Sequence, residues 1–331
     1  MPKISVIIPV YNVGKYIENS MKSVVSQHFT DFEVVLVDNN TPDNSIEIAE
    51  NILKKTKVDY RVVKQTIQGL PAARNMGIAQ AKGEWIVSID PDDTISPFFL
   101  EELYRYANES GLSVVFGEYD EVEEKGLFLF PEEEKKDAFE VLDREYTLKK
   151  LLTRELPLMV SNMFFKKSFF IEHGFQFDQG VILGADLMLV WRIILNLEKI
   201  GHLNKKLYNH FFRSDSLITA PSSKKIETNL AGYRRTCDYV AKNYNKEFSE
   251  WIYARELYGL LSVVSVHGEY KMLKDNINLY YTKDIHKSLQ TFPDKRIVIM
   301  DKILCLCPWL FFHINKQLRQ PNSWLFKFIH K

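Results

Sequence analysis

Residues 85–93 read WIVSIDPDD, a short apolar run that leads directly into a cluster of acids. The run, opened by Gly83 and Glu84, is typical of a buried strand. The three carboxylates of Asp90, Asp92 and Asp93 repel one another unless a cation lies among them. Mg²⁺ or Mn²⁺ fits best, because these hard ions take oxygen ligands and need only one or two protein carboxylates. The alternative is an acidic turn that caps a following helix.

Three more apolar runs precede this strand and alternate with helical patterns. We expect strands at 4–10, 32–38 and 58–64, and helices at 14–27, 45–55 and 71–81. This alternation predicts βαβ units, and therefore an α/β fold with a mostly parallel sheet. Ligands of such sheets bind outside the carboxyl ends of the strands. Tyr11, Asp38 and the acids at 90–93 follow three of the four expected strands, which predicts a binding site at that edge.

Composition excludes several classes of protein. The chain has 331 residues, 46% of them hydrophobic and 26% charged, as is ordinary for a globular protein. Lys+Arg and Asp+Glu both total 43, so net charge gives no reason to expect a nucleic-acid partner. The three cysteines cannot form a disulfide framework, and Cys305 and Cys307 without further ligands are not a zinc pattern.

The chain ends suggest where the protein works. No signal-peptide pattern precedes the first expected strand, and a reducing cytosol fits the cysteine content. The apolar run at 303–312 is shorter than the roughly 20 residues that a bilayer span requires. We expect a cytoplasmic protein, or one held peripherally at the inner face of the membrane. The tail at 303–331 mixes aromatic and basic residues, as interfacial helices do. Internal packing and a homodimer contact are the alternatives for this tail.

The first strand is followed by no G-x-G-x-x-G and the chain contains no P-loop, so a bound nucleotide would depend on a metal and basic side chains. Six segments match a known family: 5–12, 37–45, 69–77, 81–93, 184–192 and 210–213. Through them the chain resembles the family 2 glycosyltransferases of GT-A fold, which are inverting, metal-dependent enzymes that use nucleotide sugars. The resemblance is strong over 1–120, patchy over 160–217 and absent beyond.

The resemblance implies a nucleotide-sugar site and a metal site, with Mn²⁺ or Mg²⁺ as cofactor. Tyr11 would stack on the base, and because stacking tolerates any base, a second group must read it. Many relatives have a second acid where this chain has Asn39, and that acid accepts the uracil N–H. The amide oxygen of Asn39 can accept the same bond, so a UDP-sugar is favoured, but its NH₂ group could instead donate to another base. The nucleotide-sugar residues would be Pro9, Tyr11, Asp38, Asn39, Arg74, Asp90 and Arg213. The metal residues would be Asp92, Asp93 and His210.

Inversion requires a general base for the acceptor hydroxyl, and the resemblance points to Asp186. The alternative is that Asp186 only begins an amphipathic helix, facing its dipole. Ala185 stands where relatives usually have glutamate, which removes one acid of the acceptor motif. His210, among aromatic neighbours, is equally compatible with a half-buried strand histidine.

The expected organisation is a GT-A domain over 1–217, Rossmann-like with a mostly parallel sheet flanked by helices, and a helical region over 218–331. Within the first domain, 1–120 would form the nucleotide-sugar half and 121–217 the acceptor half. The resemblance implies an inverting hexosyltransferase that moves a sugar to a hydroxyl of a bacterial surface glycan (capsule, exopolysaccharide or lipopolysaccharide) or of a lipid-linked oligosaccharide. A nucleotide-sugar-binding module without turnover is the alternative. A nucleotidyltransferase would need a glycine-rich basic loop after the first strand, which is lacking.

Overall fold

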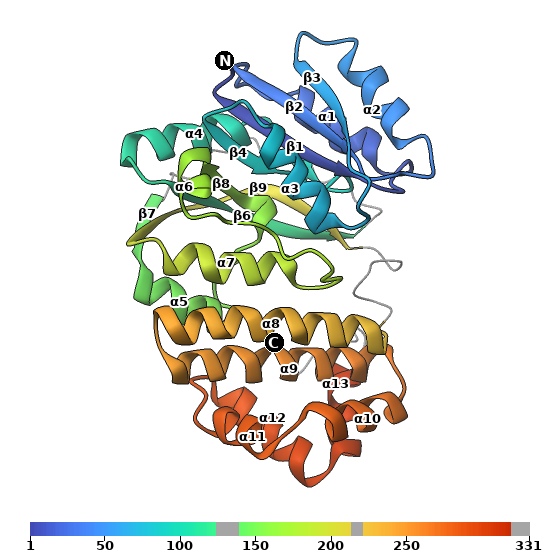
Figure 1. Ribbon diagram of the computed structural model, residues 1–331, viewed down its shortest axis with the longest axis vertical. Helices are drawn as coiled ribbons and strands as arrows, with labels where there is room; N and C mark the ends of the chain where they lie inside the picture. Colours follow the sequence, from blue (N-terminus) through green and yellow to red (C-terminus); the bar gives the residue numbers. More distant parts are fainter. Residues whose placement is uncertain (124–138, 213–220, 319–331) are drawn as a thin grey trace. The chain divides into compact units, whose positions relative to one another are not determined.

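The computed structural model describes residues 1–123, 139–212 and 221–318. The chain forms two compact units, Met1–Arg213 and Ser214–Lys331, coloured blue to yellow and yellow to red (Figure 1). The boundary predicted at residue 217 lies outside the described residues. Each unit has its own core of buried apolar residues.

The first unit is built on a nine-stranded mixed sheet with the order β3-β2-β1-β4-β8-β6-β9-β5, and β7 pairs with β9. Strands β3, β2, β1 and β4 are parallel, as predicted, while β8 runs antiparallel to both β4 and β6. The strands are β1 (Ile4–Val10), β2 (Phe32–Asp38), β3 (Asp59–Lys64), β4 (Trp85–Ser88), β5 (Thr94–Ile95), β6 (Val114–Glu123), β7 (Phe139–Asp143), β8 (Met163–Lys166) and β9 (Lys199–Phe212).

Helices cover both faces of the parallel strands. Every residue of β1 is buried, as expected for a strand covered on both sides. One face packs with α1 and α4 in a single apolar core, while α3 lies against the other face, where Gly77 approaches Ile7 and Val37. The helices of this unit are α1 (Ile17–Val25), α2 (Ser45–Leu53), α3 (Leu70–Gln80), α4 (Phe99–Ser110), α5 (Arg144–Thr153), α6 (Lys167–Glu172) and α7 (Ala185–Leu195), with a 3-10 turn at Val160–Asn162.

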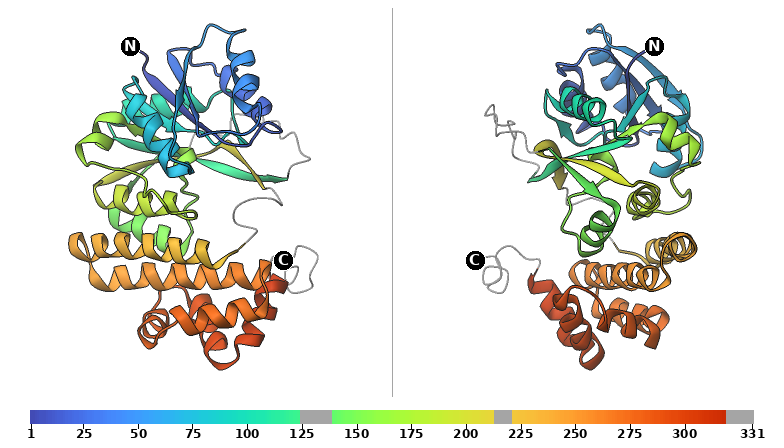
Figure 2. Two further views of the ribbon diagram at one scale, coloured as in Figure 1. Left: turned by 45° about the vertical axis from the view of Figure 1, so that its right-hand side comes forward. Right: turned by 90° about the vertical axis from the view of Figure 1, so that its left-hand side faces the viewer.

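The described part of the second unit is helical, which confirms the predicted helical appendage. Helices α8 and α9 are its longest and lie side by side in every view (Figures 1 and 2). The helices are α8 (Ser223–Asn243), α9 (Lys246–His267), α10 (Tyr270–Tyr280), α11 (Lys283–Gln290), α12 (Lys295–Leu306) and α13 (Pro308–Leu318). Within the described ranges, no helix combines the length and the apolar character needed to cross a membrane.

Candidate active site

The carboxyl ends of β1, β2 and β4 meet at one edge of the sheet. Val10 pairs with Asp38 and Ile7 with Ser88, so the residues that follow these strands are neighbours. Tyr11 is 49% exposed, as a ring that offers a face to a ligand must be. Asp38 is half-buried and accepts a hydrogen bond from the backbone N–H of Thr41 at 2.9 Å. Pro9 is buried within β1, beside Val37.

Asp43 holds the two loops at this edge together, although the sequence alone gave it no role. Its carboxylate accepts hydrogen bonds from the Gly14 N–H at 2.8 Å, from the Thr41 hydroxyl at 2.7 Å and from the Ser45 hydroxyl at 2.5 Å. Partial burial raises the pKa of Asp43, but these donors more than compensate and lower it to about 2. The charged carboxylate therefore fixes the loop that carries Tyr11 against the turn after β2.

The amide of Asn39 is fully engaged inside the protein. Its side chain is 2% exposed, and Nδ2 donates to the carbonyls of Gln65 at 3.1 Å and Ile67 at 2.7 Å. Its Oδ1 accepts from the N–H of Gly69 at 2.8 Å, at the start of α3. Asn39 thus positions the loop at 65–69, and reading of a base by this amide would require those bonds to open.

Arg74 is the centre of the site. Its side chain, on α3, is fully buried, and Nη2 contacts Asp90 Oδ1 at 2.7 Å while Nη1 pairs with Asp186. Nε donates to the Ser88 hydroxyl at 3.3 Å, and the ring of Phe177 lies 5.4 Å from the guanidinium carbon. Burial works against the charge, but the two carboxylates outweigh it and raise the pKa of Arg74. A permanent cation therefore links α3, the end of β4 and the start of α7.

The two carboxylates on Arg74 differ in their surroundings. Asp90 accepts a second hydrogen bond, from the Ser161 hydroxyl at 2.8 Å. Asp186 is the second residue of α7, and its side chain remains 36% exposed. Burial raises the pKa of Asp186, while Arg74 lowers it and Asp90 raises it further. The result is a carboxylate held by one strong contact, still reachable, and more basic than a free aspartate.

Asp93 and His210, both predicted to bind metal, face each other. Asp93 is fully buried, and its Oδ2 accepts from the Tyr208 hydroxyl at 2.6 Å and lies 3.1 Å from His210 Nδ1. Its Oδ1 accepts from the N–H of Phe211 at 2.9 Å. The bond from Asp93 raises the pKa of His210 to about 9, so the imidazole is charged at neutral pH. Metal coordination by Asp93 would compete with these donors, and its neighbour Asp92 is half-buried rather than fully buried.

The donor set fits a metal shared with a substrate rather than a closed protein cage. Within the described ranges, no three histidine, cysteine or acidic side chains converge on one point at this edge. Asp90 faces Arg74 and Ser161, and Asp93 faces Tyr208 and His210. Mg²⁺ and Mn²⁺ are commonly held by one or two carboxylates with substrate phosphates supplying the rest. The Asp92 carboxylate could supply such a ligand. Arg213, predicted to contact the nucleotide sugar, lies outside the described residues.

Sequence reasoning missed Tyr208 and Ser161 as contributors to the site. Tyr208 precedes His210 by two residues on β9, so the two side chains share a face of the strand, and this spacing could have revealed it. Ser161 belongs to a short turn before β8 and gives no such signal.

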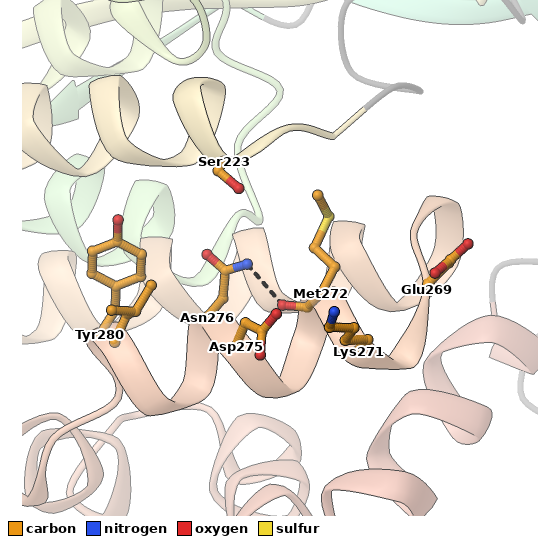
Figure 3. Close-up of a pocket in the computed structure, with 8 residues that line it drawn as sticks. Ser223, Glu269, Lys271, Met272, Asp275, Asn276 and Tyr280 are labelled. Carbon is orange, nitrogen blue, oxygen red and sulfur yellow. Dashed lines mark hydrogen bonds between the residues drawn. The ribbon is translucent and has the colours of Figure 1, made fainter.

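A cavity of about 240 Å³ lies elsewhere, in the second unit, between Ser223 at the start of α8 and one side of α10 (Figure 3). The Asn276 amide on its wall donates to the carbonyl of Met272 at 2.8 Å. None of the predicted site residues lines this cavity. Its other lining residues are Glu269, Lys271, Asp275, Leu279 and Tyr280.

The chain is similar to known glycosyltransferases in sequence and in fold. A family model described as "Glycosyl transferase family 2" matches residues 5–174. The chain is 30% identical over 275 residues to the GalNAc(5)-diNAcBac-PP-undecaprenol beta-1,3-glucosyltransferase of Campylobacter jejuni, covering 74% of this chain and 85% of the relative. It is 27% identical over 308 residues to glycosyltransferase GlyG of Streptococcus pneumoniae, covering 88% and 96%. The crystal structure of S. aureus TarS 1–349 matches with a TM-score of 0.65 at 20% identity, covering 96% of this chain and 90% of TarS.

Proposed function

Because the chain belongs to glycosyl transferase family 2, we propose that it transfers a sugar, with inversion, from a UDP-sugar to a hydroxyl of a surface glycan or lipid-linked oligosaccharide. The predictions of a GT-A fold, of a transferase and of a bacterial polysaccharide-type relative are confirmed.

The observation that carries the proposal is the pairing of Arg74 with both Asp90 and Asp186. It places a carboxylate from α7 next to the strand end where a nucleotide would lie. We assign Asp186 as the general base that takes the acceptor hydroxyl's proton during in-line displacement. Its raised pKa increases its basicity, and the contact with Arg74 keeps it ionised and oriented.

On the donor side, we assign the exposed ring of Tyr11 to base stacking and the end of β2, with Asp38, to base recognition. We assign Pro9, which is buried in β1 beside Val37, to supporting this site from below. UDP is favoured because two of the matching structures are TarS 1–349 in complex with UDP and with UDP-GlcNAc. Asn39 contributes by holding the adjoining loop.

We assign Mn²⁺ or Mg²⁺ to Asp92, where the bound ion would neutralise the departing diphosphate. A mannosyltransferase of the same fold, PcManGT from Pyrobaculum calidifontis, is described in complex with GDP-Man and Mn²⁺. His210, charged through its bond to Asp93, adds a second positive group for the diphosphate. Arg213, three residues further on, is assigned the same role. Asp93 is then a positioning residue for His210.

The base assignment is tested by Asp186→Asn in a UDP-release assay with a panel of glycan and lipid-linked acceptors. We expect donor affinity to stay within about 2-fold and kcat to fall by about 10²–10⁴-fold, the usual contribution of a general base. Asp59→Asn, at an exposed position at the start of β3, is the control and should behave as wild type. Undiminished turnover in Asp186→Asn would place the base elsewhere. Donor binding by the wild type without turnover on any acceptor would favour a binding module.

A lipid-linked acceptor would bring the protein to a membrane, and we propose that the face formed by the end of α12 and the start of α13 makes that contact. Large apolar side chains are exposed there: Leu306 at 86%, Trp309 at 54% and Leu310 at 42%. Such side chains bury favourably at the headgroup boundary. The predicted tail residues 319–331 lie outside the described residues.

Flotation with anionic vesicles tests this contact. The Leu306→Ser/Trp309→Ser double variant should lose vesicle binding, whereas Leu279→Ser, which removes a side chain 70% exposed on α10, should retain it. Light scattering is measured in parallel. If the wild type forms dimers and does not bind vesicles, the face is a homodimer contact instead.

A further inference from the structure

Four side chains that could bind a metal meet in the second unit, and none of them belongs to the predicted site. Tyr281 follows α10, His286 lies on α11, and Asp301 and Cys305 lie one turn apart on α12. Ligand atoms of His286, Asp301 and Cys305 all lie within 4.8 Å of one another. Across the described ranges, this is the one group of three such side chains that converge. In the linear sequence, Cys305 had shown no companion ligands except Cys307.

The distances already approach those of a tetrahedral site. His286 Nδ1 lies 2.7 Å from Asp301 Oδ2 and 3.2 Å from Cys305 Sγ. The Tyr281 hydroxyl lies 3.2 Å from the same nitrogen and 3.3 Å from the sulfur, and it also contacts Asp301. Ligand atoms around Zn²⁺, at about 2.0 Å for N and O and about 2.3 Å for S, lie about 3.3–3.7 Å apart. Small outward movements would therefore admit the ion.

The polar contacts of this cluster converge on His286 and Asp301. A single ring nitrogen carries at most one proton, yet Nδ1 of His286 faces a carboxylate, a thiol and a phenol at once. Asp301 is fully buried, and among the described residues its ion-pair partner is the His286 imidazole, whose Nδ1 lies 2.7 Å from Oδ2. A buried carboxylate is costly unless it is paired or bound to a metal, and here the same groups could serve either purpose. A central cation would satisfy all four groups together.

The surroundings also resemble those of a metal site. Gln290, one turn after His286 on α11, donates from Nε2 to Asp301 Oδ2 at 2.6 Å, as outer-shell partners of metal ligands do. Cys305 is exposed and the His286 side chain is 39% exposed, so an ion can enter from solvent.

We propose that His286, Asp301 and Cys305, with Tyr281 as the fourth ligand, bind Zn²⁺. Thiolate and imidazole prefer Zn²⁺ to Mg²⁺ or Mn²⁺, so this ion is distinct from the one assigned to Asp92. Binding releases the Cys305 thiol proton and the Tyr281 phenol proton to solvent. Because the protein fills all four positions, the ion is structural and joins the end of α10 to α11 and α12.

The test uses the full-length chain, stripped with a chelator and titrated with Zn²⁺ or Co²⁺ in the presence of excess Mg²⁺. The titration is repeated in the Asp92→Asn variant, so that the metal position assigned to Asp92 does not add to the number of ions bound per chain. We expect one zinc ion per chain, and with Co²⁺ a sulfur-to-metal charge-transfer band together with the intense visible bands of tetrahedral cobalt. Cys305→Ser and His286→Ala should each weaken binding at least about 100-fold, and Gln290→Ala by about 10–100-fold.

Cys307→Ser is the matched control, because Cys307 lies two residues from Cys305 and makes none of these contacts. It should retain the affinity and the charge-transfer band. Circular dichroism verifies that each variant is folded. The cobalt spectrum of the wild type tests the proposal even if a variant fails to fold. Absence of the charge-transfer band in folded wild-type protein would overturn the proposal, as would equal binding by Cys305→Ser and Cys307→Ser.

Discussion

Replacement of Arg74 tests the link between stability and catalysis in this site. In Arg74→Met, the buried side chain keeps an apolar stem of similar length but loses the guanidinium that bridges Asp90 and Asp186. Breaking a buried ion pair by removing one partner costs roughly 3–5 kcal/mol. The carboxylates are 23% and 36% exposed, so water can partly replace the lost contacts. We therefore expect the free energy of unfolding to fall by about 3 kcal/mol, the lower end of that range.

The same change should alter the pH dependence of turnover. The guanidinium opposes the rise in the pKa of Asp186 that burial and Asp90 cause, so its removal raises that pKa further. A base must be ionised to act, and the acidic limb of the kcat profile should therefore move to higher pH. Arg74→Lys keeps a charge that cannot bridge both carboxylates, and it should give an intermediate result in both measurements.

Urea unfolding and the pH profile of UDP release measure the two effects. Arg61→Met is the control, because Arg61 binds Glu33 with two nitrogens at 2.8 and 3.0 Å, towards the other end of the parallel strands. It should reduce stability without moving the pH profile. Wild-type stability in Arg74→Met, or an equal shift of the pH profile in Arg61→Met, would refute the reasoning.

Three further changes test the parts that hold the site. Asp43→Ala should cost about 2 kcal/mol at neutral pH. The folded-state pKa of Asp43, about 2, lies below the usual 3.8. The greater stability of the wild type should therefore be present above pH 3.8 and disappear as the pH falls through 2, which urea unfolding at several pH values would measure. Gly77→Ala should lower the free energy of unfolding by about 1–3 kcal/mol, since the added Cβ would lie 2.3 Å from Ile7 Cγ2; wild-type stability would show that α3 can move away. Tyr208→Phe removes a 2.6 Å hydrogen bond to buried Asp93 and should cost about 1.5–3 kcal/mol, and an unchanged midpoint would argue against that bond.

The parallel half of the sheet could be predicted because its signals are local. The strands at 4–10 and 32–38 have the predicted bounds, since continuous apolar runs are what burial on both faces requires. The third strand is one residue shorter than predicted and the fourth ends at Ser88. The helix expected over 14–27 spans only 17–25, because helix ends depend on caps and packing more than on periodicity.

The contacts within the site could not be predicted, because they join segments far apart in the chain. Arg74 and Asp186 are 112 residues apart, and only the return of the chain through β8 to α7 brings them together. In the same way, burial of Asp93 depends on β9, which supplies Tyr208 and His210. Neighbouring acids such as Asp92 and Asp93 look alike in sequence, and the tertiary structure separates their environments.

The most direct test of the central claim is calorimetric titration of the wild type and Asp92→Asn with a UDP-sugar panel, with and without Mn²⁺. The account predicts that one UDP-sugar binds the wild type in a metal-dependent manner and that Asp92→Asn loses the metal dependence. GDP- and dTDP-sugars, run alongside, should bind more weakly. Binding of a UDP-sugar that is equally tight without metal, or unaffected by Asp92→Asn, would contradict the metal assignment. Failure of every nucleotide sugar to bind would contradict the donor site itself.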